Sequence, residues 1–123
     1  MLLVDSSGWL EFFTNGPLAG TYAQYLKHPN DILTPTIVLY EVYKLIKRQR
    51  TEEAALTAAA QMGKTQLVSL NDTIALTAAD ASLTYQLAMA DAIVYATALI
   101  HKAKLVTSDA DLASLPGVVY HKT

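Results

Sequence analysis

The chain has 123 residues, 52% of them hydrophobic, and a formal net charge of −2. This length fits one domain over residues 1–123 with a substantial hydrophobic core, and the apolar content excludes a disordered chain. The net charge excludes a surface that is basic overall and attracts nucleic acid everywhere. No apolar run reaches the roughly 18 residues of a membrane span and no signal peptide is evident, so no membrane contact is expected. The absence of cysteine excludes disulfides and thiolate metal sites and is consistent with a cytoplasmic protein.

Short apolar strands and longer helices are predicted to alternate along the whole chain. In chain order the predicted elements are a strand at 1–4, helices at 6–13 and 19–27, a strand at 32–33, helices at 34–50 and 51–63, a strand at 66–70, helices at 71–87 and 90–102, a strand at 104–107, a helical turn after 109 and a strand at 118–120. The expected helix caps are Ser6 or Ser7, Thr34, Thr51, and Asn71 or Asp72. This alternation predicts an α/β fold with a parallel sheet covered on both faces. An all-helical fold is the alternative, because short strands and short helices have similar patterns.

Several acidic residues stand where strands end or helices begin. Asp5 follows the first strand, Asp109 and Asp111 follow the strand at 104–107, and Asp91 lies in the first turn of its helix. In an open parallel sheet these positions share one edge, and ligands bind there. Glu41 lies one to two turns into its helix, so it reaches this edge only if that helix leans inward.

The surroundings of two of these acids are apolar. Glu41 has Ile37, Val38 and Leu45 as helical neighbours, and Asp91 lies within an alanine-rich, apolar run. A carboxylate in such a place costs several kcal/mol unless it is paired or bound to a metal. Few basic residues are placed to pair with these acids, so a divalent cation is expected. Oxygen ligands without Cys or His favour Mg²⁺ or Mn²⁺ over Zn²⁺.

Each acid also has a simpler explanation. Asp5 and Asp109 are suitable helix caps, Asp91 complements a helix dipole, and Glu41 alone is able to reach solvent. Independent caps need not share an edge, however, so their common position favours a single site.

Four segments, taken in order, carry a resemblance to a known family: Val4–Ser7, Pro35–Val42, Ala90–Ala98 and Leu105–Leu112. They resemble the PIN domain, and in particular the VapC-type toxins, the ribonuclease half of a bacterial or archaeal toxin–antitoxin pair. The likeness covers essentially the whole chain, although residues 51–80 carry little of it.

The resemblance implies a three-layer α/β/α sandwich with a central parallel sheet of four or five strands. It implies an Mg²⁺- or Mn²⁺-dependent endoribonuclease whose partners are RNA, an antitoxin that covers the acidic groove, and a second copy of the chain. The residues that it implies are the catalytic and metal-binding Asp5, Glu41, Asp91 and Asp109, the further metal ligand Asp111, and the supporting hydroxyls of Ser6 and Thr107. Asp91 or Glu41 is the expected proton acceptor from water.

A cluster of basic residues follows Glu41 on the same helix. Its members are Lys44, Lys47, Arg48 and Arg50. They are candidate RNA contacts, because phosphate binding near an acidic site needs cations. The alternative is a solvated helix end, where cations complement the helix dipole.

Two other functions compete with a nuclease. An aspartyl phosphotransferase or phosphatase also places an Asp after its first strand, but it usually needs a second Asp two residues later, where this chain has Ser7. A non-catalytic PIN-like module that binds RNA or protein is the other alternative, and the complete set of four acids argues against it.

Overall fold

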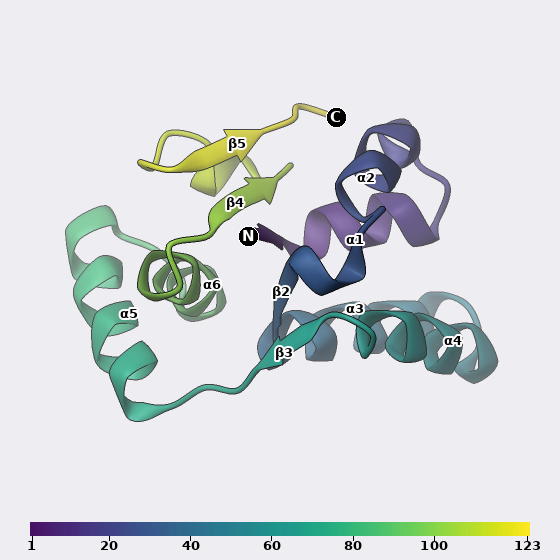
Figure 1. The fold of residues 1–123 in the computed structure, drawn as a ribbon, viewed down its shortest axis with the longest axis horizontal. Helices are drawn as coiled ribbons and strands as arrows, with labels where there is room; N and C mark the ends of the chain where they lie inside the picture. The colour runs from purple at the N-terminus through teal and green to yellow at the C-terminus, as the bar shows by residue number, and fades with distance from the viewer.

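The computed structural model describes all residues from 1 to 123 and contains a five-stranded parallel sheet (Figure 1). The sheet order is β3-β2-β1-β4-β5, and every neighbouring pair is parallel. The strands are β1 (Leu2–Val4), β2 (Ile32–Pro35), β3 (Gln66–Val68), β4 (Lys104–Thr107) and β5 (Val118–Tyr120). The predicted parallel sheet is thus confirmed, and the all-helical alternative is wrong.

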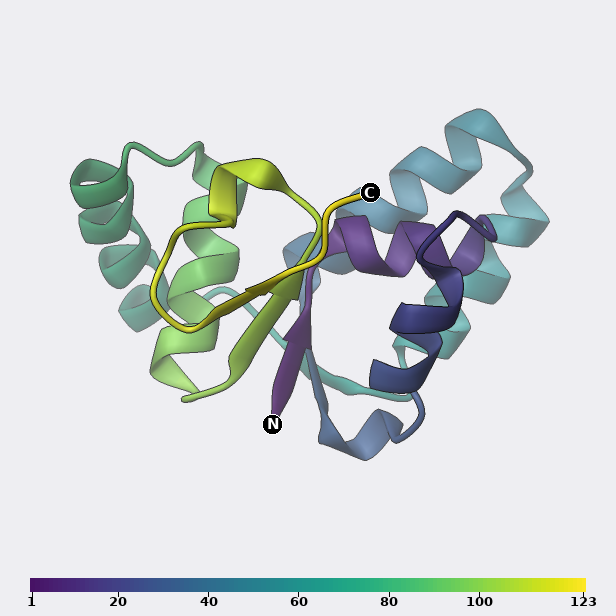
Figure 2. The ribbon, with the colours of Figure 1, turned by 90° about the horizontal axis from the view of Figure 1, so that it is seen from above.

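Helices cover both faces of this sheet (Figures 1 and 2). They are α1 (Ser6–Phe13), α2 (Ala19–Tyr25), α3 (Thr36–Gln49), α4 (Glu52–Met62), α5 (Asp72–Tyr85) and α6 (Met89–Ile100), with 3₁₀ turns η1 (Pro29–Asp31) and η2 (Ala110–Leu112). The chain moves outward from β1 to β3 with α1 to α4 on one face, then returns to β4 with α5 and α6 on the other. Right-handed crossovers require this change of face when the direction of strand addition reverses.

The central strand β1 is buried between its two neighbours. Leu3 pairs with Leu33 of β2 and with Leu105 of β4, and Leu3 and Val4 are fully buried. Among the aromatic residues of the opening helix, Trp9 is buried in this core.

None of the helices is by itself long and apolar enough to cross a membrane; only α5 and α6 taken together, bent by 115°, meet that test by length and composition.

Two of the predicted helix caps are confirmed. The Thr51 hydroxyl accepts a hydrogen bond from the amide of Ala54 at 3.0 Å, and the Asn71 side chain accepts one from the amide of Ile74 at 2.9 Å. These short polar side chains satisfy amide groups that have no partner inside the helix.

Two other predicted caps are wrong. Strand β2 continues through Pro35, so Thr34 is a buried strand residue whose hydroxyl bonds that of Thr65 at 2.6 Å. At the start of α1 the cap position belongs to Asp5, not to Ser6 or Ser7, and the Asp5 carboxylate makes no capping bond. That carboxylate is therefore available to other partners.

Candidate active site

The candidate site lies where β1 and β4 end. Val4 and Val106 are paired across the two strands, so Asp5 and Thr107 come next to one another, and the Asp5 amide donates to the carbonyl of Val106 at 3.0 Å. The carboxyl ends of adjacent parallel strands thus deliver Asp5 and the segment after Thr107 to one edge of the sheet.

Asp5 is the most deeply buried acid of the chain, with 3% of its surface exposed. Its Oδ2 accepts hydrogen bonds from the hydroxyls of Thr107 at 2.8 Å and Ser7 at 3.3 Å. Burial raises the pKa of Asp5, and the charge of Asp109 adds to the rise, while the hydroxyl bonds oppose it. The predicted supporting role of Thr107 thus has a direct contact.

A network of hydroxyl groups holds the segment that follows β4. Thr107 Oγ1 accepts from the amide of Asp109 at 2.9 Å, and Ser7 Oγ accepts from the amide of Ser108 at 2.9 Å. The Ser108 hydroxyl in turn bonds the hydroxyl of Tyr22 at 2.7 Å. The sequence alone indicated no role in the site for Ser108 or Tyr22, and for Ser7 it indicated only a helix cap. Ser7 lies two residues after Asp5 in the first motif, which was a usable signal, whereas Tyr22 lies 86 residues from its partner.

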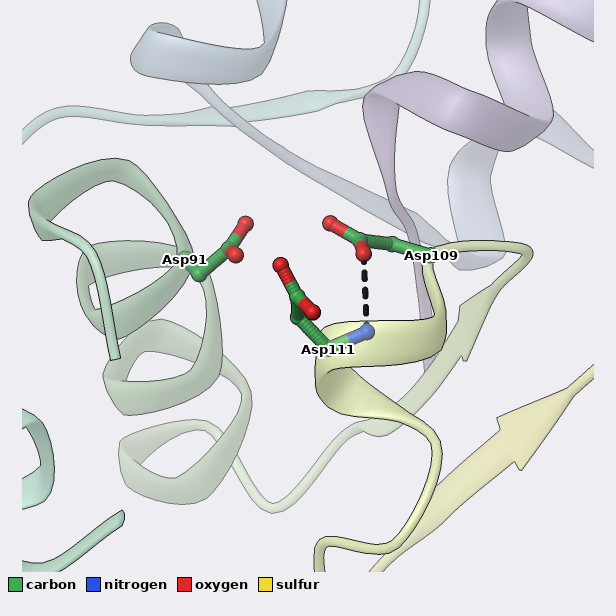
Figure 3. A group of neighbouring side chains, drawn as sticks. All are labelled: Asp91, Asp109 and Asp111. Atoms are coloured by element: carbon green, nitrogen blue, oxygen red, sulfur yellow. Dashed lines mark hydrogen bonds between the residues drawn. The ribbon is translucent and has the colours of Figure 1, made fainter. Parts of the chain in front are cut away.

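Three carboxylates converge between α6 and η2 (Figure 3). Asp91, Asp109 and Asp111 each offer an oxygen, and these three atoms lie within 4.8 Å of one another. Asp91 projects from the first turn of α6, and Asp109 caps η2 by accepting from the amide of Asp111 at 2.9 Å. The cap interpretation of Asp109 is therefore correct, and the same residue also belongs to the acidic group.

Glu41 faces this group from α3. It is half-buried, and burial raises its pKa, with further contributions from the charges of Asp5 and Asp109. The hydroxyl of Ser6 acts in the opposite direction, which places that hydroxyl beside the Glu41 carboxylate. Glu41 thus lies close enough to feel the other acids, although it is outside the set of three oxygens within 4.8 Å.

No cationic side chain forms an ion pair with any of these carboxylates. The one ion pair of the protein joins Lys47 to Glu52 at 3.2 Å, and neither residue belongs to the site. Burial and then the charges of the other four acids raise the pKa of Asp91 to about 7. Five carboxylates without a positive partner fit a divalent cation, and their hard oxygen donors suit Mg²⁺ or Mn²⁺.

The four basic residues predicted to bind RNA are divided between different places. Lys44 and Arg48 line a pocket together with Ser6 and Glu41, next to the acids. Lys47 pairs with Glu52 instead. Arg50 lines a separate cleft that is formed mainly by the end of α1 and by α4.

Comparison with solved structures shows this fold in toxin proteins. The chain is similar to one in a toxin–antitoxin complex from Klebsiella pneumoniae, with 24% identity, 100% of each chain covered and a TM-score of 0.84. It is similar to the VapC20 toxin of Mycobacterium tuberculosis, described as cleaving the sarcin–ricin loop, with 18% identity, 92% of each chain covered and a TM-score of 0.75. It is also similar to a chain of VapBC2 from Rickettsia felis bound to promoter DNA, with 12% identity, 98% and 97% covered and a TM-score of 0.76.

The two sequence comparisons had different outcomes. A search of curated proteins found no match. The family model of the PIN domain, in contrast, matches residues 2–118, which include every acid of the site. The chain therefore belongs to the PIN domain family.

Proposed function

We propose that this protein is a metal-dependent endoribonuclease and the toxin of a toxin–antitoxin pair. The observation that carries the proposal is the meeting of Asp5, Glu41, Asp91, Asp109 and Asp111 at one sheet edge without a cationic partner. Membership of the PIN domain family and the likeness in fold to toxins support it.

The chain's own carboxylates would hold the metal. Asp91, Asp109 and Asp111 already converge, and Asp5 and Glu41 add charge from the other side. A bound Mg²⁺ or Mn²⁺ supplies charge neutralisation at the phosphate and lowers the pKa of a water molecule.

The remaining steps belong to protein groups. Thr107 and Ser7 fix the direction of the Asp5 carboxylate, because both hydroxyls donate to the same oxygen. Asp91 or Glu41 is our candidate acceptor for the proton of the attacking water, because burial and the neighbouring acids raise the pKa of both, that of Asp91 to about 7. Lys44 and Arg48 would position the RNA through its phosphates without reading its sequence.

The phosphotransferase alternative is not supported by the surroundings of Asp5. A nucleophilic carboxylate must approach the phosphorus atom, but Asp5 is 3% exposed and its Oδ2 accepts two hydroxyl bonds. These features suit a carboxylate that stays in place.

Two protein partners complete the proposal: an antitoxin and a second copy of the chain. Exposed apolar side chains on α5 and at the start of α6 could contribute to such contacts. They include Leu76, Leu83 and Met89, which are 70%, 83% and 74% exposed.

The test is cleavage of a mixed transfer and messenger RNA substrate by the purified chain with Mg²⁺, with Mn²⁺ and with EDTA. Wild type is compared with Asp5→Asn and Asp91→Asn, and with Asp80→Asn as a matched control, since Asp80 is exposed on α5. We expect metal-dependent cutting by wild type and control only. Cutting that survives EDTA or both site substitutions would contradict the acidic site as the origin of the activity.

A further inference from the structure

A pocket between α1 and α3 adjoins the acidic residues. Its volume is about 290 Å³, close to the lower end of the roughly 300–1,000 Å³ that ligand pockets occupy. The lining residues are Ser6 and Leu10 of α1 and Tyr40, Glu41, Lys44, Leu45 and Arg48 of α3. The pocket thus combines an aromatic ring, two cations and one acid of the site.

Tyr40 is the unusual member of this set, because 59% of this large aromatic residue is exposed. The ammonium of Lys44 donates to its hydroxyl at 3.2 Å and lies 5.4 Å from the ring centre. The ammonium is thus nearer the edge of the ring than its centre, so ring surface remains open to a ligand. Tyr43, one turn along, is by contrast packed against the core.

The pocket and the acidic site share a wall. Glu41, one of the acids of the site, lines the pocket together with Ser6, which directly follows Asp5 in the chain. Tyr40 is the neighbour of Glu41 in the chain. Lys44 and Arg48 follow Tyr40 at intervals of four residues, which places them on one row of α3, about 6 Å apart along the axis.

We propose that this pocket is a subsite for the RNA nucleotide that flanks the cleaved phosphate, with Tyr40 stacking on its base and Lys44 and Arg48 contacting phosphates along the strand. The inference rests on the proposed nuclease function and adds single-stranded RNA as the substrate form at this position. Stacking on an aromatic ring beside a positively charged row is how single strands are held without sequence preference. A duplex would keep its bases inside the stack and leave the ring without a partner.

An acidic peptide is the competing occupant. Such a peptide satisfies the two cations but gains nothing from an open ring surface, and the charge of Glu41 repels both occupants alike. A nucleotide offers both a phosphate and a flat base, so it uses the two cations and the aromatic ring together.

The experiment measures binding, so it does not depend on catalysis. A fluorescein-labelled single-stranded 12-nucleotide RNA with 2′-O-methyl groups, which resists cleavage, is titrated with protein in Mg²⁺ and followed by anisotropy. The variants are Tyr40→Ala, Tyr40→Phe, Lys44→Gln and, as a matched control, Tyr85→Ala. Tyr85 is 40% exposed at the end of α5, a helix that covers the opposite face of the sheet from α3 (Figure 1). Circular dichroism verifies that each variant is folded.

We expect Tyr40→Ala to weaken binding by roughly 5- to 150-fold, the range for loss of one stacked base. Tyr40→Phe keeps the ring and should stay within a few-fold of wild type, and Tyr85→Ala should be unchanged. Lys44→Gln should lower the slope of log affinity against log salt by about 0.7, whereas Tyr40→Ala should leave that slope unaltered.

Two results would overturn the subsite. One is RNA binding by Tyr40→Ala equal to that of wild type. The other is obtained with a labelled deca-glutamate peptide: it binds wild type more tightly than the RNA does, and Tyr40→Ala weakens its binding more than that of the RNA. This outcome would assign the pocket to a protein partner. Tyr40-dependent binding by a chain that cuts no RNA would keep the subsite and reject only the nuclease.

Discussion

Replacing Asp91 by asparagine should stabilise the metal-free protein at alkaline pH. Asp91 carries a charge that burial and four neighbouring acids disfavour, and its pKa rises from 3.8 to about 7 as a result. A folded-state pKa above the unfolded value means that stability is fully present below pH 3.8 and is lost as pH rises to about 7. Asparagine keeps the shape of the side chain but does not ionise, so it removes this loss of stability at high pH.

The size of the effect follows from the pKa. At about 1.4 kcal/mol per tenfold change in ionisation, a rise from 3.8 to about 7 corresponds to about 4 kcal/mol at pH 8. Asp91 is only partly buried, so water screens the repulsion, and we expect about 2 kcal/mol. At pH 5 the folded carboxyl is already protonated, and the expected gain from Asp91→Asn is below about 1 kcal/mol.

Urea denaturation in EDTA at pH 5 and pH 8 measures these gains. Asp80→Asn is the control, because this exposed residue should change stability by less than about 0.5 kcal/mol at either pH. A gain for Asp91→Asn that is equal at the two pH values would refute the reasoning, because it would show that ionisation is not its origin. No gain at pH 8 would show that the five acids do not repel one another as their positions require.

Other expectations concern the metal, the hydroxyl network and a close approach of helices. Mg²⁺ added at pH 8 should raise the melting temperature of wild type more than that of Asp91→Asn, because only the bound ion's ligands differ between them; equal shifts would show that the ion binds elsewhere. Thr107→Val should cost about 1–3 kcal/mol in urea denaturation and lower RNA cleavage, because the buried hydroxyl that donates to Asp5 is lost; an unchanged midpoint would contradict this. Gly8→Ala should cost about 1–3 kcal/mol, because its new methyl group would overlap the Tyr22 ring, while Gly20→Ala, with open space around it, should be close to neutral; equal effects would reject the steric explanation.

The sequence by itself determined the order of the elements and the edge at which the acids meet. Local patterns fix both: short apolar runs such as residues 104–107 alternate with helices, and an aspartate directly after such a run lies at a carboxyl end whatever the strand order is. Caps such as Thr51 and Asn71 were also predictable, because they act within three residues of the chain. Thr34 was not, since a buried hydroxyl 31 residues away offered it a partner inside the sheet.

Only the tertiary structure decided how the acids are divided and what surrounds them. Asp111 joins Asp91 and Asp109 within 4.8 Å, while Asp5 lies outside that set and accepts a hydrogen bond from the Thr107 hydroxyl, 102 residues away. The sequence named these residues, but it did not indicate which of the acids converge. The exposure of Tyr40 beside the site is likewise a consequence of how α1 packs on α3. Such features depend on strand order and helix packing between distant segments, so the pattern of residues along the chain does not contain them.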